Sequence, residues 1–407
     1  MSADYPTVRF GAFFGPYHLP KIDSNVALRQ DLELIDHLDR LGFAEAWIGE
    51  HHSGGVELIA SPEIFVAAAA ERTKRIKLGL GVVSLPYHHP FLVADRIVLL
   101  DHLTRGRVIF GAGPGQLADD SRMVGINPLD NRRKMEESFS VIHRLLHGET
   151  VTEQTDWYRM DGAYLHMKPY SDIEMACTAT VSPNGPNLAG RFGASLLSLA
   201  ATNPVGVGLL ADHWKIATQV AGENNQTVSR ANWRLVGIMH IAETEEQARD
   251  ECRYGLLELL NYLSHLSPGG VEYDDFDKLV DDYNESGFMV IGTPDMAVKQ
   301  VERLQEMSGG FGTWLNLQGD WANPAATRRC YELIAAEVAP RFNGDRPVRQ
   351  RGYEDVVTSN HKAGNITAEA QRLARERFVA QRTAASRPRL PDHPPSVDRD
   401  DLPADGA

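Results

Sequence analysis

The chain of 407 residues has few cysteines and no long apolar run. Only Cys177, Cys252 and Cys330 are present, widely spaced and odd in number, which excludes a disulfide framework and a CxxC metal site. This usage indicates a reducing, cytoplasmic location. Residues 1–7 contain no basic segment followed by an apolar run, and no stretch approaches about 18 uninterrupted apolar residues. We therefore expect neither secretion nor a membrane span.

An excess of positive charge is also missing. The sequence has 41 Lys and Arg residues against 55 Asp and Glu residues, giving a formal net charge of -14. Nucleic-acid binders usually concentrate Lys and Arg on one face, so no nucleic-acid partner is expected. The apolar fraction of 43% is enough for a sizeable folded core.

Apolar, strand-like runs alternate with helix-patterned segments along most of the chain. This alternation predicts parallel βα units, whose strands are continuous apolar runs because both faces of the sheet are covered. The eight predicted strands are 8–14, 44–49, 76–85, 108–110, 173–181, 195–200, 233–241 and 313–317. The predicted helices are 26–41, 62–71, 91–104, 132–146, 187–192, 205–220, 245–263 and 294–307. Ser61 and Thr293 each precede a proline at a predicted helix start, as N-caps do.

Two segments interrupt the alternation, and the C-terminal part differs in composition. Residues 151–169 predict a hairpin insertion, and the acidic residues 264–286 predict a long loop, which is usually a lid or disordered. After residue 343, Arg, Pro and Ala dominate, and only 366–379 keeps an apolar periodicity typical of a helix. The proline-rich residues 386–407 are predicted to be disordered.

Candidate acid–base groups follow the second predicted strand. Ligands of parallel sheets lie beyond the carboxyl ends of the strands, and there the chain has Glu50, His51 and His52. An imidazole titrates near neutral pH and can donate or accept a proton at a reaction centre. The alternative is that both histidines only satisfy neighbouring carboxylates or backbone groups.

His88 and His89, after the third predicted strand, raise the hypothesis of a metal site shared with His51 and His52. Such sites need ligands that converge from several strand ends. Adjacent histidines point in different directions, and Asp320 is the one obvious carboxylate at the end of a later strand. We therefore predict no metal.

Two strand exits could bind an anion. The exit with Gly111, Gly113 and Gly115 resembles a GxGxG phosphate loop, which alone is weak evidence, and Pro114 removes a backbone donor. The alternative is a tight turn at the end of the strand. At the second exit, Ser182, Asn184 and Gly185 precede a predicted helix, where backbone amides, a hydroxyl and a glycine suit an anion. Helix capping alone would use the same residues.

The motif LLDHLTRGRVIFGAGPG, residues 99–115, closely follows a signature of the bacterial-luciferase-like flavin monooxygenases. The chain resembles this family over residues 8–340, most strongly over 47–52, 79–90 and 99–115. Within the family it is most similar to the limonene 1,2-monooxygenase branch. The resemblance implies an α/β protein with a (β/α)8 barrel in residues 1–343, with insertions after strands 4 and 7. Residues 344–407 would form a helical, then disordered extension.

The resemblance also implies roles for residues at the mouth of the barrel. His51 matches the histidine that acts beside the flavin as a base or hydrogen-bond partner, with Glu50 as its neighbour. Gly81 and Val82 match a non-prolyl cis peptide beneath the flavin ring. The full set implied to bind the cofactor is Gly81, Val82, Gly113, Gly115, Ser182, Asn184 and Gly185. Where luciferase has a phosphate-binding arginine this chain has Pro114, so loosely held flavin, used as a diffusible cosubstrate, is expected.

The implied activity is a monooxygenation. Reduced FMN, or FAD, supplied by a separate flavin reductase that uses NADH or NADPH, would react with O2 to give a C4a-(hydro)peroxide. One oxygen atom would then pass to a small apolar substrate such as a terpene alkene. The strand-exit residues His18, Tyr87, Trp314 and Trp321 would wall the substrate pocket, although aromatic packing is the alternative for each. The family also implies a homodimer.

Two alternatives stay open. Deazaflavin-dependent oxidoreductases share the barrel, and some of them have a catalytic glutamate at the position of Pro114. The absence of that glutamate here disfavours this branch. A flavin-binding protein without turnover is the second.

Overall fold

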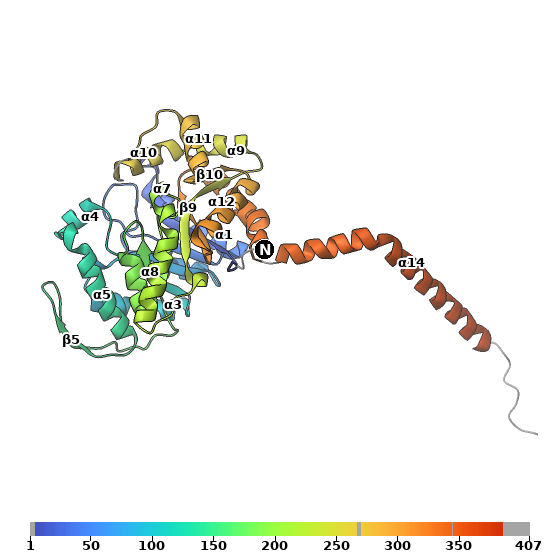
Figure 1. Ribbon diagram of the computed structural model, residues 1–407, viewed down its shortest axis with the longest axis horizontal. Coiled ribbons are helices and arrows are strands. Elements are labelled where there is room, and N and C mark those ends of the chain that lie inside the picture. Colours follow the sequence, from blue (N-terminus) through green and yellow to red (C-terminus); the bar gives the residue numbers. More distant parts are fainter. Residues whose placement is uncertain (1–4, 267–269, 344, 386–407) are drawn as a thin grey trace, which may run out of the picture. The chain divides into compact units, whose positions relative to one another are not determined.

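The computed structural model describes residues 5–266, 270–343 and 345–385. The chain divides into two compact units, Met1–Asp345 and Arg346–Ala407 (Figure 1). In the first unit a parallel sheet closes on itself with helices outside, which confirms the predicted barrel.

The eight strands of the closed cylinder are those predicted from the apolar runs. Their order around the barrel is β1, β2, β3, β4, β7, β8, β9, β11, and β11 pairs with β1 to close it. They span Arg9–Tyr17, Glu45–Ile48, Lys77–Ser84, Val108–Gly113, Glu174–Ala179, Ser195–Ser198, Arg234–Ile241 and Thr313–Gly319. A further strand, β10 (Met289–Gly292), pairs with the C-terminal half of β9 and was not predicted, because its apolar run is very short.

Most predicted helices are present, with two corrections. The helices α1, α2, α3, α5, α6 and α12 span Ser24–Leu41, Pro62–Arg72, Pro90–Thr104, Asn131–Leu146, Asn184–Phe192 and Pro294–Ser308. The predicted helices 205–220 and 245–263 are each two helices: α7 (Pro204–Gly208) with α8 (Leu210–Glu223), and α9 (Glu245–Cys252) with α10 (Leu256–Leu266). The second break contains Gly255, where a Cβ would lie 2.2 Å from the carbonyl oxygen of Asp320. The helices α4 (Ala118–Met123) and α13 (Pro324–Leu333) were not predicted.

Only one of the two predicted N-caps makes its side-chain hydrogen bond. The Ser61 side chain accepts a hydrogen bond from the backbone N–H of Ile64 at 3.4 Å. Thr293 occupies the cap position of α12 without such a bond.

The two insertions lie where they were expected. After β4 come α4, α5 and the predicted hairpin, formed by the antiparallel strands β5 (Val151–Gln154) and β6 (Arg159–Ala163). After β9 come α9, α10, α11 (Phe276–Ser286) and β10, and Figure 1 shows these helices gathered at one end of the barrel unit. The prediction of a loop over 264–286 was therefore wrong for α11, which buries Phe276, Leu279 and Val280 and turns its acidic residues to solvent.

The barrel interior is filled by side chains from alternate strand positions. The inner cluster consists of Phe13, Trp47, Ile109, Ala176, Leu197, Val236 and Leu315. The large Trp47 ring fits because its neighbouring strands carry glycines: a Cβ at Gly79 would lie 2.2 Å from the ring, and one at Gly111 would lie 2.8 Å from it. The middle of the barrel is thus packed, and space for a ligand is left at its C-terminal mouth.

The second unit contains all of α14 (Asp345–Ala385) except its first residue. This helix is longer than the predicted segment 366–379, and its described side chains are exposed. The predicted disorder of 386–407 lies outside the described residues. Across the described part of the chain, no helix combines the length and apolar character needed to cross a membrane.

Candidate active site

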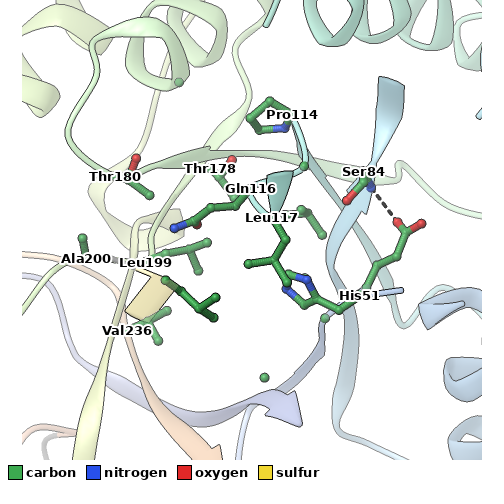
Figure 2. Close-up of a pocket in the computed structure, with 18 of the residues that line it drawn as sticks. His51, Ser84, Pro114, Gln116, Leu117, Thr178, Thr180, Leu199, Ala200 and Val236 are labelled. Atoms are coloured by element: carbon green, nitrogen blue, oxygen red, sulfur yellow. Dashed lines mark hydrogen bonds between the residues drawn. The ribbon is translucent and has the colours of Figure 1, made fainter. Parts of the chain in front are cut away.

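A cavity of about 600 Å³ lies among the C-terminal ends of the barrel strands. This volume is within the range of small-molecule and cofactor sites. Its wall includes Phe13 and Tyr17 of β1, Val82 and Ser84 of β3, and residues that follow β2, β4, β7 and β8. Figure 2 shows part of this wall, with the His51 ring directed into the space.

His51 lies at the cavity wall between two buried carboxyl groups. Its Nδ1 is 3.2 Å from Oδ2 of Asp120, and its Nε2 is 3.3 Å from Oε1 of Glu57. The other oxygen of Asp120 accepts hydrogen bonds from the backbone N–H of His52 and the hydroxyl of Ser53. Since Asp120 belongs to α4, this helix fixes the loop that carries His51.

The three ionisable groups, His51, Glu57 and Asp120, shift one another's pKa values. Burial lowers the pKa of His51, but the hydrogen bond with Asp120 and the charges of Glu57 and Asp120 raise it above its usual value. Burial raises the pKa of Glu57 to about 7, although the neighbouring His51 opposes this shift. Burial also raises the pKa of Asp120, but hydrogen bonds from His51 and Ser53 make the net shift downward. Asp120 is therefore the fixed anion, and His51 and Glu57 hold the exchangeable protons.

Glu50 has a different environment from that of His51, although it follows the same strand. Its Oε1 accepts hydrogen bonds from Nε2 of His52 at 3.0 Å and Nε2 of His88 at 2.6 Å. Its Oε2 accepts from the backbone N–H of Ser84 at 2.6 Å, the bond drawn in Figure 2. Burial would raise the pKa of Glu50, but these bonds lower it to about 2. Glu50 thus stays ionised and ties the end of β2 to the end of β3.

The turn predicted to bind an anion lies at the cavity. Ser182, Asn184 and Gly185 all line it, and the cap residue of α6, Pro183, makes no side-chain hydrogen bond to the first amides of the helix. A Cβ at Gly185 would lie 1.9 Å from the carbonyl oxygen of Thr178, so this glycine lets α6 begin against β7.

The neighbouring helix α5 adds polar groups to the same end of the cavity. The two helices lie side by side, with Phe139 of α5 packed on Phe192 of α6. From the first turn of α5, Asn131 and the exposed Arg132 line the cavity. Asn131 is buried, and its Oδ1 has no hydrogen-bond partner among the described residues. An anionic ligand here would meet backbone amides, a hydroxyl and a guanidinium group.

Much of the remaining wall is apolar, with polar side chains such as Thr178 and Thr202 between the apolar ones. Figure 2 shows Leu199, Ala200 and Val236 on one side, with Gln116 and Leu117 from the loop after β4 reaching toward them. Further apolar lining comes from Phe13, Ile238, Leu263, Leu266, Phe288 and Leu317. Such a wall suits a small apolar molecule and keeps water away from it.

Of the predicted site residues, His51, Glu50, Gly81, Val82, Gly115, Ser182, Asn184 and Gly185 line the cavity. The peptide bond Gly81–Val82 is cis, as the resemblance implies. Gly113 is not among the lining residues; a Cβ there would lie 2.4 Å from the Val82 side chain.

The four residues predicted to wall the substrate pocket do not line the cavity. His18 is buried between Asp31 and Asp320, with ring nitrogens 2.8 Å and 3.3 Å from their carboxylates. Trp314 lies in the outer core because strand alternation sends its neighbour Leu315 into the barrel. Trp321 packs on Tyr17 and donates its indole N–H to the carbonyl of Leu317.

Tyr87 lies behind the wall, where its hydroxyl shares a 3.0 Å hydrogen bond with that of Ser121.

Among the residues that the structure describes, no group of three or more His, Cys, Asp or Glu side chains could hold a metal ion.

Glu57, Asp120 and Arg132 were not predicted from the sequence as site residues. Glu57 could have been noticed as a lone acid within the apolar run from Val56 to Ile59. Nothing in the sequence distinguishes Asp120 from the adjacent Asp119 until the direction of α4 is known, because only one of them can face His51.

Comparison with known proteins gives one consistent result. Residues 8–309 match the model of the luciferase-like monooxygenases. The chain is 64% identical over 382 residues to limonene 1,2-monooxygenase of Rhodococcus erythropolis. The aligned residues cover 94% of this chain and 99% of the relative. It is 42% identical to 4-hydroxyprotoasukamycin monooxygenase of Streptomyces nodosus subsp. asukaensis, covering 90% and 99% of the two chains.

Solved structures share the fold. The oxygenating constituent of 3,6-diketocamphane monooxygenase from Pseudomonas putida, solved with FMN, matches with a TM-score of 0.67 and 24% identity over 83% of this chain and 99% of that chain. The coenzyme F420-dependent tetrahydromethanopterin reductase of Methanopyrus kandleri matches with a TM-score of 0.61 and 22% identity over 83% and 99%.

Proposed function

The chain belongs to the family of luciferase-like monooxygenases, and we propose that it transfers one oxygen atom from O2 to a small apolar alkene of the limonene type. One observation carries the proposal: a single cavity combines His51 and Glu57, an anion-binding end and a largely apolar wall. The substrate class is supported by the 64% identity to a limonene 1,2-monooxygenase over nearly the whole of both chains.

The residues of the cavity fit a flavin. Ser182, Asn184, Gly185 and Arg132 would hold its phosphate, and Oδ1 of Asn131, which has no hydrogen-bond partner among the described residues, would accept a hydrogen bond from the ligand. Gly81 and Val82, which line the cavity, would contact its isoalloxazine ring. FMN is the first cofactor to test because the cavity has one such anion-binding turn, and FAD is the second. The bound, reduced flavin would supply the activation of O2 and the oxygen transfer.

The protein's own groups would orient the reactants and manage protons. His51 would hold or donate a proton at the reacting oxygen, and Glu50 would keep the His51 loop in place through β3. The wall of Leu199, Val236 and Leu317 would bind the alkene and exclude water. We also propose that residues 1–343 carry the whole site, because every lining residue lies between Phe13 and Leu317.

Reduced flavin would come from a separate flavin reductase that uses NADH or NADPH, and the enzyme would act in the cytoplasm as a homodimer. Light scattering of the purified protein, alone and with a reductase, tests the assembly. A monomer at micromolar concentration would contradict the dimer.

Product analysis tests the proposed function. The protein is incubated with a flavin reductase, NADH, FMN or FAD, and a panel of alkenes that includes limonene, under isotopically labelled O2. Mass spectrometry should find an epoxide with one labelled oxygen atom. Reoxidised flavin with no labelled product from any alkene would instead indicate a flavin-binding protein. Reduction of a substrate only with reduced deazaflavin, without oxygen incorporation, would indicate the deazaflavin branch.

Replacing Arg132 with alanine is expected to weaken flavin binding by about tenfold or more, because a hydrogen bond to a charged group contributes about 1.5–3 kcal/mol. Titration of flavin fluorescence at two salt concentrations measures this, and the salt dependence of binding should fall. The matched control is Arg144→Ala near the other end of α5, whose guanidinium pairs with Glu149 at 3.0 Å and Glu153 at 2.9 Å; none of these three residues lines the cavity. Equal affinities in the two variants would exclude Arg132 from the phosphate site.

A further inference from the structure

The contacts of His51 fix the number of protons that its site must hold. Each ring nitrogen faces a carboxyl oxygen, Asp120 at 3.2 Å and Glu57 at 3.3 Å. A neutral imidazole carries one N–H and can donate to one of them only. Its other nitrogen would then direct a lone pair at an ionised oxygen, in a place where the Glu57 and Asp120 side chains are each only 2% exposed. Like charge density at this distance is unfavourable away from water, so one additional proton must lie in the cluster.

Two arrangements satisfy the cluster. Either His51 is an imidazolium between two carboxylates, or Glu57 is protonated and donates to Nε2 while Nδ1–H is donated to Asp120. Both have the same net charge of -1 and differ only in the position of one proton between Oε1 of Glu57 and Nε2 of His51. Asp120 is ionised in both, since three donors around it favour its carboxylate form.

We propose that Glu57 shares this proton with His51, so that the two side chains act as one acid–base unit in the oxygen-transfer reaction. Both of its members line the cavity. When the unit gives its proton to an acceptor in the cavity, the charge of the cluster changes from -1 to -2, and a proton from solvent restores it. Glu57 is thus a positioning residue that keeps His51 supplied with a proton, and Asp120 holds the ring orientation. The inference deepens the proposed function and rests on it for the identity of the reaction.

The other groups around Glu57 favour this sharing. Tyr17, whose backbone pairs with that of Glu57, and Tyr262 of α10 are the other titratable groups whose interaction with Glu57 is resolved. Burial and the Glu57 charge raise the pKa of both phenols, so both stay neutral. The buried Tyr262 hydroxyl has no hydrogen-bond partner within the described part of the chain. His51 is therefore the cation that stabilises ionised Glu57, and a hydrogen bond from the neutral Tyr17 side chain adds to this stabilisation. The charge of Asp120 opposes the ionisation of Glu57.

The sharing can be measured without flavin, O2 or substrate. In ligand-free protein labelled with carbon-13 at the histidine rings, the His51 signal is identified by its loss in His51→Asn and is titrated in wild type and in Glu57→Gln. The glutamine keeps the shape of the side chain and removes the charge, so the titration midpoint should fall by about one pH unit or more. The matched control is Glu251→Gln, which removes the carboxylate 2.8 Å from His240, away from the cavity, and should leave the His51 midpoint unchanged.

A His51 midpoint in Glu57→Gln within about 0.3 pH units of wild type would overturn the proposal, since it would assign the proton to the Asp120–His51 pair alone. Should Glu57→Gln not fold, infrared spectra of wild type with glutamate-selective carbon-13 labelling decide. A protonated glutamate band at about pH 6 that disappears by about pH 9 supports the sharing, and its absence overturns it. Because these readouts need no turnover, they stand even if no alkene is oxygenated.

Turnover distinguishes the proton role from mere support of the fold. In Glu57→Gln, kcat should fall about tenfold or more with little change in the KM for the alkene. The fall should be larger at high pH, because His51 of the variant loses its proton at a lower pH than His51 of the wild type. A KM increase at unchanged kcat would contradict the proton role.

Discussion

Replacing His51 with alanine is expected to lower the rate of oxygenation by about 100-fold or more while flavin still binds. The ring of His51 is held at the cavity by Asp120, and alanine removes the group that carries a proton there. The anion-binding turn at Ser182 and the apolar wall are untouched, so affinity for flavin should change little. Labelled product measured by mass spectrometry gives the rate, and fluorescence titration gives the affinity.

The control for this variant is His102→Ala. His102 is an exposed histidine on α3 that hydrogen-bonds to the carbonyl of Lys168, and it should be dispensable. His51→Ala also leaves Glu57 and Asp120 without their cation, so its thermal unfolding should be recorded beside the rates. Unchanged turnover in a folded His51→Ala protein would remove His51 from the mechanism.

The barrel could be predicted because buried parallel strands carry a strong local signal. Each of the eight runs, such as 76–85, is largely apolar, and a helix pattern of sufficient length follows most of them. Features that depend on tertiary contact were missed. The break between α9 and α10 comes where Gly255 packs against the backbone of Asp320, and the four residues of β10 are too few to show a period.

The site was predicted only as far as strand ends determine it. His51 and the turn at Ser182 reach the cavity because the carboxyl ends of parallel strands share one mouth. The side of the strand on which a residue lies is less evident from the sequence. Trp314 was predicted to line the pocket, although strand alternation turns it outward. Groups that come from the insertions, such as Asp120 on α4, meet His51 only through the tertiary fold.

An ion cluster at the closed end of the barrel has the largest expected effect on stability. Arg234 is fully buried and donates from Nε and Nη2 to the two carboxylate oxygens of Glu45, at 2.9 Å and 3.0 Å. Its Nη1 donates to Glu174. These three residues begin β9, β2 and β7, so the cluster lies at the N-terminal end of the barrel, opposite the cavity. There it joins strands that are distant in sequence and closes the base beneath Trp47.

Arg234→Met is expected to lower the free energy of unfolding by about 3–5 kcal/mol, because it leaves two carboxylates without their buried partner. Urea unfolding measures this difference. The matched control is Arg328→Met, which breaks the exposed 2.8 Å pair with Glu33 between α13 and α1 and should cost no more than about 1 kcal/mol. Similar losses in both variants would mean that the buried cluster adds nothing to the barrel.

The pH dependence separates charge from packing in the same variant. Burial raises the pKa values of Glu45 and Glu174, but the Arg234 charge outweighs it and lowers both in the folded protein. Their contribution to stability is therefore complete above the unfolded pKa of about 4.3 and is lost as the pH falls through the folded values. In Arg234→Met the carboxyls lose this support and can become neutral in acid, so the deficit relative to wild type should shrink below about pH 4. A deficit that stays constant from neutral to acid pH would assign the loss to the missing side-chain volume, and the ion cluster would then not be what stabilises the base of the barrel.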